Sequence, residues 1–225
     1  MTLQRSLWST ACAVALLTLP VAAAAQPAVY EIRVTNAMKG ESLTPLGAIT
    51  HVPGIHLFQI GDPAPSVLEA VAEEGNLDPL FTLVRSVPQV VYDAEMTSGL
   101  TGPGQTSTLT VNARPGASLT LVAMLIPTND GFIALNGVEL PRGFEPAVFT
   151  PVAYDAGTEV NDELCASIPG PSYPECGGPG GGGAPTGGEE GFVHVHGGIH
   201  GVGDFVAADR DWRNPIARVV VRRIR

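Results

Sequence analysis

Alternating apolar and polar positions along much of the chain predict short β-strands. In VYEIRVTNA (29–37), Tyr30, Ile32 and Val34 share one side of an extended segment, and charged or polar residues occupy the other. Turn-forming residues separate further segments of this kind at short intervals, which is typical of an antiparallel β-sandwich. These further segments are QVVYDAEM (89–96), STLTVNA (107–113), SLTLVAMLI (118–126), GFIAL (131–135), FTPVAYDA (149–156), GFVHVHGG (191–198) and ARVVVRRI (217–224).

One or two short helices interrupt the strand pattern. The segment SVLEAVAEEG (66–75) is the clearest, because Ser66 and Glu69 have the spacing of a capping box and Gly75 follows as a terminator. The segment DPLFTLVRS (78–86) predicts a second helical piece.

The N-terminal residues 1–25 have the pattern of a secretory signal peptide. Arg5 precedes an apolar run, and a row of alanines before Gln26 offers a small-residue cleavage site. The apolar run is too short for a comfortable membrane span. We therefore expect a secreted or periplasmic protein, with residues 26–225 forming one β domain and no transmembrane segment after cleavage.

A long segment rich in glycine and proline, 169–191, lies inside this domain. Such a composition offers few side chains to bury, so it predicts a flexible loop. Its glycine spacings match a dinucleotide-binding fingerprint only trivially, because no strand precedes the segment and no helix follows it.

The amino-acid composition restricts the classes of molecule that the protein could bind by charge. The chain of 225 residues has 12 lysines and arginines against 22 aspartates and glutamates, for a formal net charge of −10. This balance argues against nucleic acid and anionic lipid as partners. In an oxidising compartment Cys165 and Cys176 would form a disulfide, the alternative being two free thiols.

The stretch YDAGTEVNDE (154–163) concentrates negative charge immediately after a predicted strand. Gly157 permits a sharp bend that can turn Asp155 and Glu159 toward one point, and Asp130 follows another apolar strand. Carboxylate oxygens without histidine or cysteine suit Ca²⁺. The spacing is compatible both with a calcium site at one edge of the sandwich and with a solvated acidic turn.

The histidines of GFVHVHGGIHG (191–201) form a rival constellation. On a strand His194 and His196 share one face, and His200 could fold back through two glycines to add a third imidazole. Three imidazoles would suit Zn²⁺, Cu²⁺ or Ni²⁺. The competing interpretations are a transition-metal protein or metal-dependent enzyme using these residues, and a merely polar strand face. The chain has no GxSxG, HExxH or Walker A motif, so we expect no enzymatic activity.

The order of several segments resembles the spondin N-terminal domain family, in the single-domain form of bacterial secreted proteins. The resemblance covers nearly all of residues 26–225. The segments that carry it are YEIRVTN, TPLGAITH, HLFQIGDPAPSVLEAVAEEG, IPTNDGF, YDAGTE and DWRNPIARVVV.

This resemblance implies an antiparallel β-sandwich akin to calcium- and lipid-binding modules, with a Ca²⁺ site at one end. The family's calcium ligands fall on Asp130, Asp155 and Glu159. Animal members serve matrix and cell-surface adhesion, so the expected function is a secreted, calcium-binding, non-enzymatic binding module with a protein or glycan surface partner. The chain departs from the family at Gly131, where a tryptophan is usual, and at Glu159, where an aspartate is usual.

Overall fold

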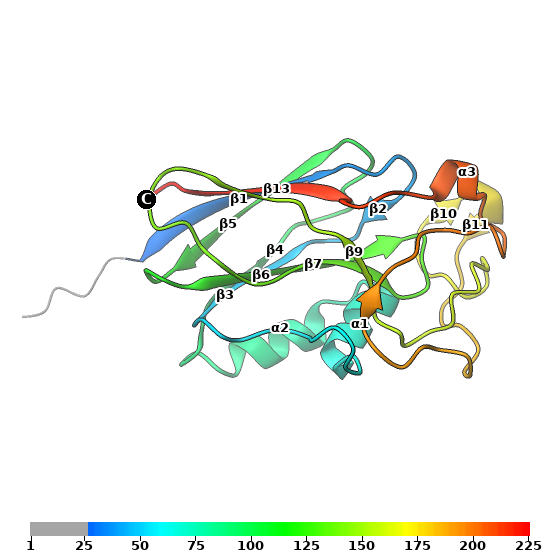
Figure 1. Ribbon diagram of the computed structural model, residues 1–225, viewed down its shortest axis with the longest axis horizontal. Helices are drawn as coiled ribbons and strands as arrows, with labels where there is room; N and C mark the ends of the chain where they lie inside the picture. The colour runs from blue at the N-terminus through cyan, green and yellow to red at the C-terminus, as the bar shows by residue number, and fades with distance from the viewer. Residues whose placement is uncertain (1–26) are drawn as a thin grey trace, which may run out of the picture.

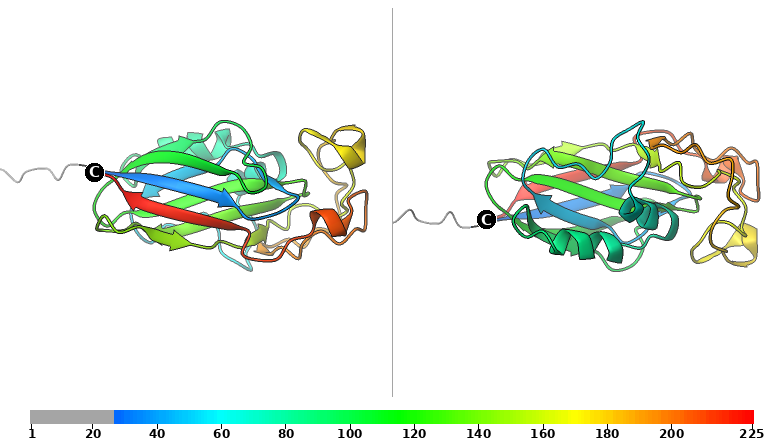
Figure 2. Two further views of the ribbon diagram at one scale, coloured as in Figure 1. Left: turned by 90° about the horizontal axis from the view of Figure 1, so that it is seen from above. Right: turned by 90° about the horizontal axis from the view of Figure 1, so that it is seen from below.

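A computed structural model describes residues 27–225. The predicted signal peptide, residues 1–25, lies outside the described residues. Two main antiparallel sheets pack face to face, as Figures 1 and 2 show. The four-stranded sheet has the order β5–β1–β13–β8, with β1 (Ala28–Asn36), β5 (Thr106–Ala113), β8 (Ala147–Phe149) and β13 (Ala217–Arg223).

The second sheet has seven strands, in the order β12–β9–β7–β6–β3–β4 with β2 added beside β6. All of its neighbouring pairs are antiparallel. The arrangement confirms the predicted all-β sandwich with short helices. The bounds are β2 (Ser42–Leu43), β3 (Gly47–His51), β4 (Val91–Met96), β6 (Ser118–Ile126), β7 (Gly131–Glu139), β9 (Ala153–Asp155) and β12 (His194–Val195).

The main core lies between the two sheets and follows the period-two pattern of the sequence. Ile32 and Val34 of β1 are fully buried, and Val219 of β13 is buried beside them. Leu119 and Leu121 of β6 belong to the same cluster and face them from the other sheet. Burial of these side chains from water is the main force that holds the sheets together.

Two helices, α1 (Ser66–Glu74) and α2 (Asp78–Arg85), cover the outer face of the second sheet (Figure 1). A second buried cluster there includes Phe81 of α2 and Val122 of β6. Strand β6 is thus covered on both faces, which explains why every one of its nine residues is buried. Within residues 27–225, no helix is long and apolar enough to cross a membrane.

The capping box predicted at the start of α1 was wrong. Ser66 is already helical and Pro65 is the N-cap, without a side-chain cap hydrogen bond. The carbonyl of Pro65 accepts the N–H groups of Leu68 and Glu69 instead. The helix start is displaced by one residue, so the Ser66 hydroxyl is not in the N-cap position that capping requires. Gly75 ends the helix as predicted, with a φ of 64°.

The end of the sandwich opposite the C-terminus is made of loops (Figure 1). The Cys165–Cys176 disulfide is present, with a Cα–Cα distance of 5.5 Å, as predicted. The glycine-rich segment contains a small hairpin rather than only irregular loop. The short elements at this end are β10 (Ser172–Tyr173), η1 (Pro174–Cys176), β11 (Gly178–Pro179) and α3 (Ala207–Arg210).

Glycine lets this segment pack backbone against backbone. A Cβ at Gly181 would collide with the carbonyl oxygen of Ala166, and the Gly181 N–H donates to the Cys165 carbonyl at 2.8 Å. The segment therefore lies close against the disulfide-linked loop through its backbone, and Tyr173 is its buried large side chain.

Candidate metal centre at the loop-rich end

Three adjacent strands bring the candidate ligands to one end of the second sheet. The β7–β9 ladder pairs Gly131 with Asp155, and the β9–β12 ladder pairs Asp155 with His194. Asp130 immediately precedes β7, and its carbonyl accepts the Ala156 N–H at 3.2 Å. The acidic turn and the histidine strand, which the sequence offered as rivals, therefore meet at one place.

Asp130 is fully buried, and its two carboxylate oxygens have different surroundings. Its Oδ2 accepts hydrogen bonds from the backbone N–H groups of Thr158 (2.7 Å) and Glu159 (3.0 Å). Its Oδ1 is buried and has no hydrogen-bond partner among the described residues. One oxygen thus fixes the acidic turn, and the other is left for a ligand.

Asp155 is also fully buried. Its Oδ1 accepts from the Gly157 N–H and its Oδ2 from the Asn161 side-chain amide, each at 2.8 Å. Gly157 has a φ of 67°, and a Cβ there would collide with the Phe192 carbonyl oxygen. The turn therefore requires glycine at this position.

Glu159, the third residue of the predicted calcium set, turns its side chain toward the glycine-rich segment. Its Oε1 accepts the Ala184 N–H at 2.8 Å. Its Oε2 is buried and has no hydrogen-bond partner in the part of the chain that the structure describes. We call Asp130, Asp155 and Glu159 the acidic set.

The acidic set disfavours full ionisation. Burial raises the pKa of Asp130 to about 7, and the charge of Asp155 acts in the same direction. Burial also raises the pKa of Asp155. Burial raises the pKa of Glu159 to about 7, opposed by the Ala184 hydrogen bond and reinforced by the charge of Glu73. A bound cation would reverse this by favouring the ionised carboxylates.

The other two carboxylates of the acidic turn have structural roles. The Asp162 Oδ2 accepts from the Ser167 hydroxyl at 2.6 Å. Glu163, with a φ of 54°, accepts the backbone N–H groups of His200, Gly201 and Val202. These contacts hold the 200–202 segment against the turn and leave Asp162 and Glu163 outside the candidate ligands.

Two imidazoles face Asp155. The His194 Nε2 lies 3.4 Å from Asp155 Oδ1 and 4.0 Å from Glu190 Oε2. The His196 Nε2 lies 3.8 Å from Asp155 Oδ2. Among the described residues, Asp155, Glu190 and His194 are the group whose ligand atoms all lie within 4.8 Å of one another. We call these three the mixed set.

The mixed set includes one residue that the sequence analysis did not name and omits two of the three histidines that it named, His196 and His200. Glu190 fell inside the segment predicted to be flexible; its only signal is its position four residues before His194. The Gly191 N–H donates to the Gly157 carbonyl at 2.8 Å, which brings Glu190 to the turn. His200 is not a member of the set, although it lines a cavity of about 300 Å³ beside His196.

Gly131, where the spondin family usually has tryptophan, occupies a crowded position. A Cβ there would approach the Thr128 hydroxyl oxygen at 2.6 Å and the His196 ring at 3.0 Å. The His196 ring thus fills space beside Gly131 that a larger side chain would need.

A scan against protein-family models found no match to this chain, and a search of curated proteins found none either. The spondin resemblance therefore stays a prediction that rests on the segments quoted above.

Proposed function

We propose that this chain is an exported, non-enzymatic β-sandwich module that binds Ca²⁺ through the acidic set, Asp130, Asp155 and Glu159. The observation that carries the proposal is the Oδ1 atom of Asp130. It is buried beside a second buried carboxylate and has no hydrogen-bond partner within residues 27–225. A buried, unpaired carboxylate oxygen costs free energy that a bound cation would recover.

The chemistry of the acidic set favours a hard cation. Its free atoms are carboxylate oxygens, and Ca²⁺ accepts six to eight oxygen ligands in flexible geometry, including backbone carbonyls and water. Hydrogen bonds from the acidic turn already hold Asp130 Oδ2 and Asp155 Oδ1 in place. This preorganisation lowers the entropy cost of binding. Mg²⁺ would bind less well, because it demands a tighter octahedron and keeps its waters.

Export and adhesion belong to the same proposal. The Cys165–Cys176 disulfide supports folding in an oxidising compartment. The net charge of −10 gives the surface little attraction for polyanions, so the proposed partner is a protein or glycan surface. The adhesive role itself is an inference from the resemblance.

The test is calcium-dependent stability of the exported protein. Thermal melts in chelator and then in rising calcium should show increasing stability, by about 2.7 kcal/mol at a hundredfold excess of calcium over Kd. The variant Asp130→Asn should weaken the response, because it removes one charge and keeps the shape. Glu189→Gln, at an exposed glutamate of the same end, is the matched control. A wild-type melting temperature that does not change with millimolar calcium would contradict the proposal and leave the acidic set with a purely structural role.

A further inference from the structure

The tautomer of the neutral His194 ring follows from its hydrogen bond. Its Nδ1 lies 3.1 Å from the backbone carbonyl oxygen of Val195. A carbonyl only accepts, so Nδ1 carries the proton in this contact, and in the neutral ring Nε2 presents a lone pair. That Nε2 atom is buried and has no hydrogen-bond partner among residues 27–225.

The lone pair of His194 faces two carboxylates, Asp155 and Glu190. A lone pair directed at two anions is repulsive unless a cation lies between them, either a proton on Nε2 or a metal ion. The three ligand atoms fit a metal. In the tetrahedral geometry of zinc, ligands bound at about 2.0–2.2 Å are about 3.3–3.6 Å apart. The separation of 3.4 Å between His194 and Asp155 lies in this range, and a small movement of Glu190 would shorten its separation of 4.0 Å from His194. All three ligand atoms lie within 4.8 Å of one another.

His196 supports this site without being a ligand. Its Nδ1 accepts the Gly198 N–H at 3.0 Å, so the proton of the neutral ring is on Nε2, which faces Asp155 Oδ2. The side chain is only 3% exposed, and its contact is with Asp155 Oδ2, whereas His194 lies beside Oδ1. This Nε2 has no hydrogen-bond partner among the described residues, so at 3.8 Å it contributes an electrostatic contact with the Asp155 carboxylate and not a hydrogen bond.

Two of the three residues of the mixed set are partly exposed, although the His194 Nε2 atom itself is buried. The side chains of His194 and Glu190 are 27% and 34% exposed, whereas that of Asp155 is 1% exposed. An ion can therefore enter from the loop surface, and water can complete its coordination. One nitrogen and two oxygen ligands with an open position suit Zn²⁺ better than Ca²⁺, which takes oxygen ligands.

We propose that His194, Asp155 and Glu190 form a second cation site, for a transition metal of the Zn²⁺ class, and that it competes with calcium for Asp155. The competition rests on the proposed calcium function, whereas the zinc site stands without it. Because the two sets share one carboxylate, occupation of either site should weaken binding at the other. The module would then respond to the ratio of the two cations outside the cell.

The experiment is calorimetric titration of Zn²⁺ into chelator-treated exported protein, without and with saturating calcium. Wild type should bind one Zn²⁺ per chain. His194→Ala and Glu190→Gln should each weaken zinc binding at least tenfold and leave calcium affinity within twofold. Asp155→Asn should lower both affinities. Circular dichroism of each variant, with His194→Gln as a second substitution, separates loss of the site from loss of folding.

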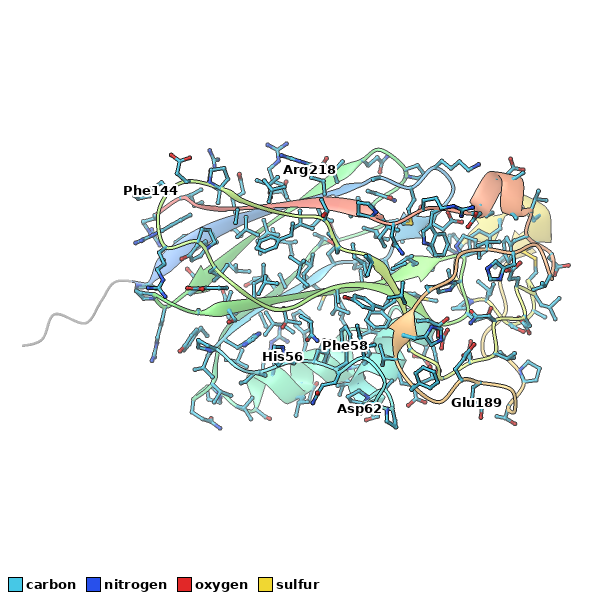
Figure 3. The ribbon with its side chains drawn as sticks, viewed as in Figure 1. His56, Phe58, Asp62, Phe144, Glu189 and Arg218 are labelled. Carbon is cyan, nitrogen blue, oxygen red and sulfur yellow. A yellow bond between two sulfur atoms is a disulfide. The ribbon has the colours of Figure 1, made fainter. Side chains whose placement is uncertain are left out.

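Two matched controls come from outside the mixed set. Figure 3 labels Glu189, in the loop beside the site, and His56, on the side of the sheet that helix α2 covers. Glu189→Gln and His56→Ala should bind zinc as wild type does. Unchanged zinc affinity in His194→Ala, or no zinc binding by wild type, would overturn the inference; the latter would mean that only a proton lies between the ligands. Zinc binding that needs His194 in a protein indifferent to calcium would keep this site and reject the calcium function.

Discussion

At the scale of single residues, Asp130 and Glu159 link cation binding to pH. Burial raises the pKa of each to about 7, so near neutrality both groups are partly protonated in the calcium-free protein. Calcium must displace these protons. Apparent affinity should therefore increase as pH rises through about 7, by up to about tenfold per pH unit for each group below its pKa. Titrations between about pH 6 and 8 measure the slope. Asp130→Asn should flatten it, and a flat wild-type profile would contradict the coupling.

A second residue-scale prediction concerns Glu41, far from the cation sites in sequence. It is fully buried, and neither carboxylate oxygen has a hydrogen-bond partner in the described part of the chain. Burial raises its pKa to about 8, and the Arg210 guanidinium offsets this only in part. Arg210 is held instead by Glu175, at 2.8 Å.

The raised pKa sets the sign of the pH effect. The folded state keeps the Glu41 proton that the unfolded state loses above about pH 4.5. Stability contributed by Glu41 is therefore complete below about pH 4.5 and falls until about pH 8, by at most about 1.4 kcal/mol per pH unit. Glu41→Gln should reduce this fall. Denaturant unfolding of both proteins at several pH values in chelator is the measurement, and identical slopes would show that the group ionises normally.

Only some residues of the candidate site could be predicted from the sequence. Asp130 and Asp155 were accessible to sequence reasoning because each lies at the end of an apolar segment: Asp130 immediately precedes β7, whose first five residues are buried, and Asp155 is the last residue of β9. Glu190 was not, because loop contacts bring it to the site: the Gly191 N–H donates to the Gly157 carbonyl, and the Asn161 side-chain amide donates to Glu190 Oε1 at 3.4 Å. A contact made by two glycines in loops leaves no periodic signal in the sequence.

At the scale of elements, the turn after β9 depends on Gly157. Its φ of 67° and the nearby Phe192 carbonyl both oppose a side chain. Gly157→Ala should destabilise the fold by about 1–3 kcal/mol and weaken the calcium response, because the turn positions Asp155. Gly99→Ala is the matched control: its φ is 77°, but a Cβ there would meet no atom within 4 Å. Denaturant unfolding compares them, and equal losses would show that the Phe192 contact has no role.

Element types were more predictable than their ends and partners. The long segments of strong periodicity became β1, β5 and β13, because a strand with one buried and one solvated face imposes the same period on the sequence, whereas the continuous apolar run became β6, which is covered on both faces. Of the strand predicted within residues 191–198, only His194–Val195 forms a strand, β12, and it pairs with the three-residue strand β9. Its length is set by the loops on either side, and local propensity does not encode them.

At the scale of the whole molecule, the sandwich and the loop-rich end differ in how they are held. The sandwich has a continuous apolar core, to which loop side chains such as Tyr173 and Phe205 are joined, and the loops depend in addition on backbone contacts and on the Cys165–Cys176 disulfide. The backbone carbonyl of Cys165 accepts the Gly181 N–H, and three residues later the Ala184 N–H donates to the Glu159 carboxylate. The covalent link thus lies close to a member of the acidic set.

Removal of the disulfide should therefore separate cation affinity from sandwich integrity. A closed loop with a sequence separation of 11 contributes about 3 kcal/mol by restricting the unfolded chain, so Cys165→Ser with Cys176→Ser should lower stability by about that amount. Calcium affinity should fall several-fold, because the segment that positions Glu159 loses its anchor. Backbone amides of β1 and β13 should keep their protection from hydrogen exchange, while amides of the 165–184 segment lose theirs. The decisive measurement is calcium titration of oxidised, reduced and serine-substituted protein at one temperature well below all three melting transitions. Equal calcium affinity in all three would show that Glu159 is held by the acidic turn alone, independently of the loop that the disulfide closes.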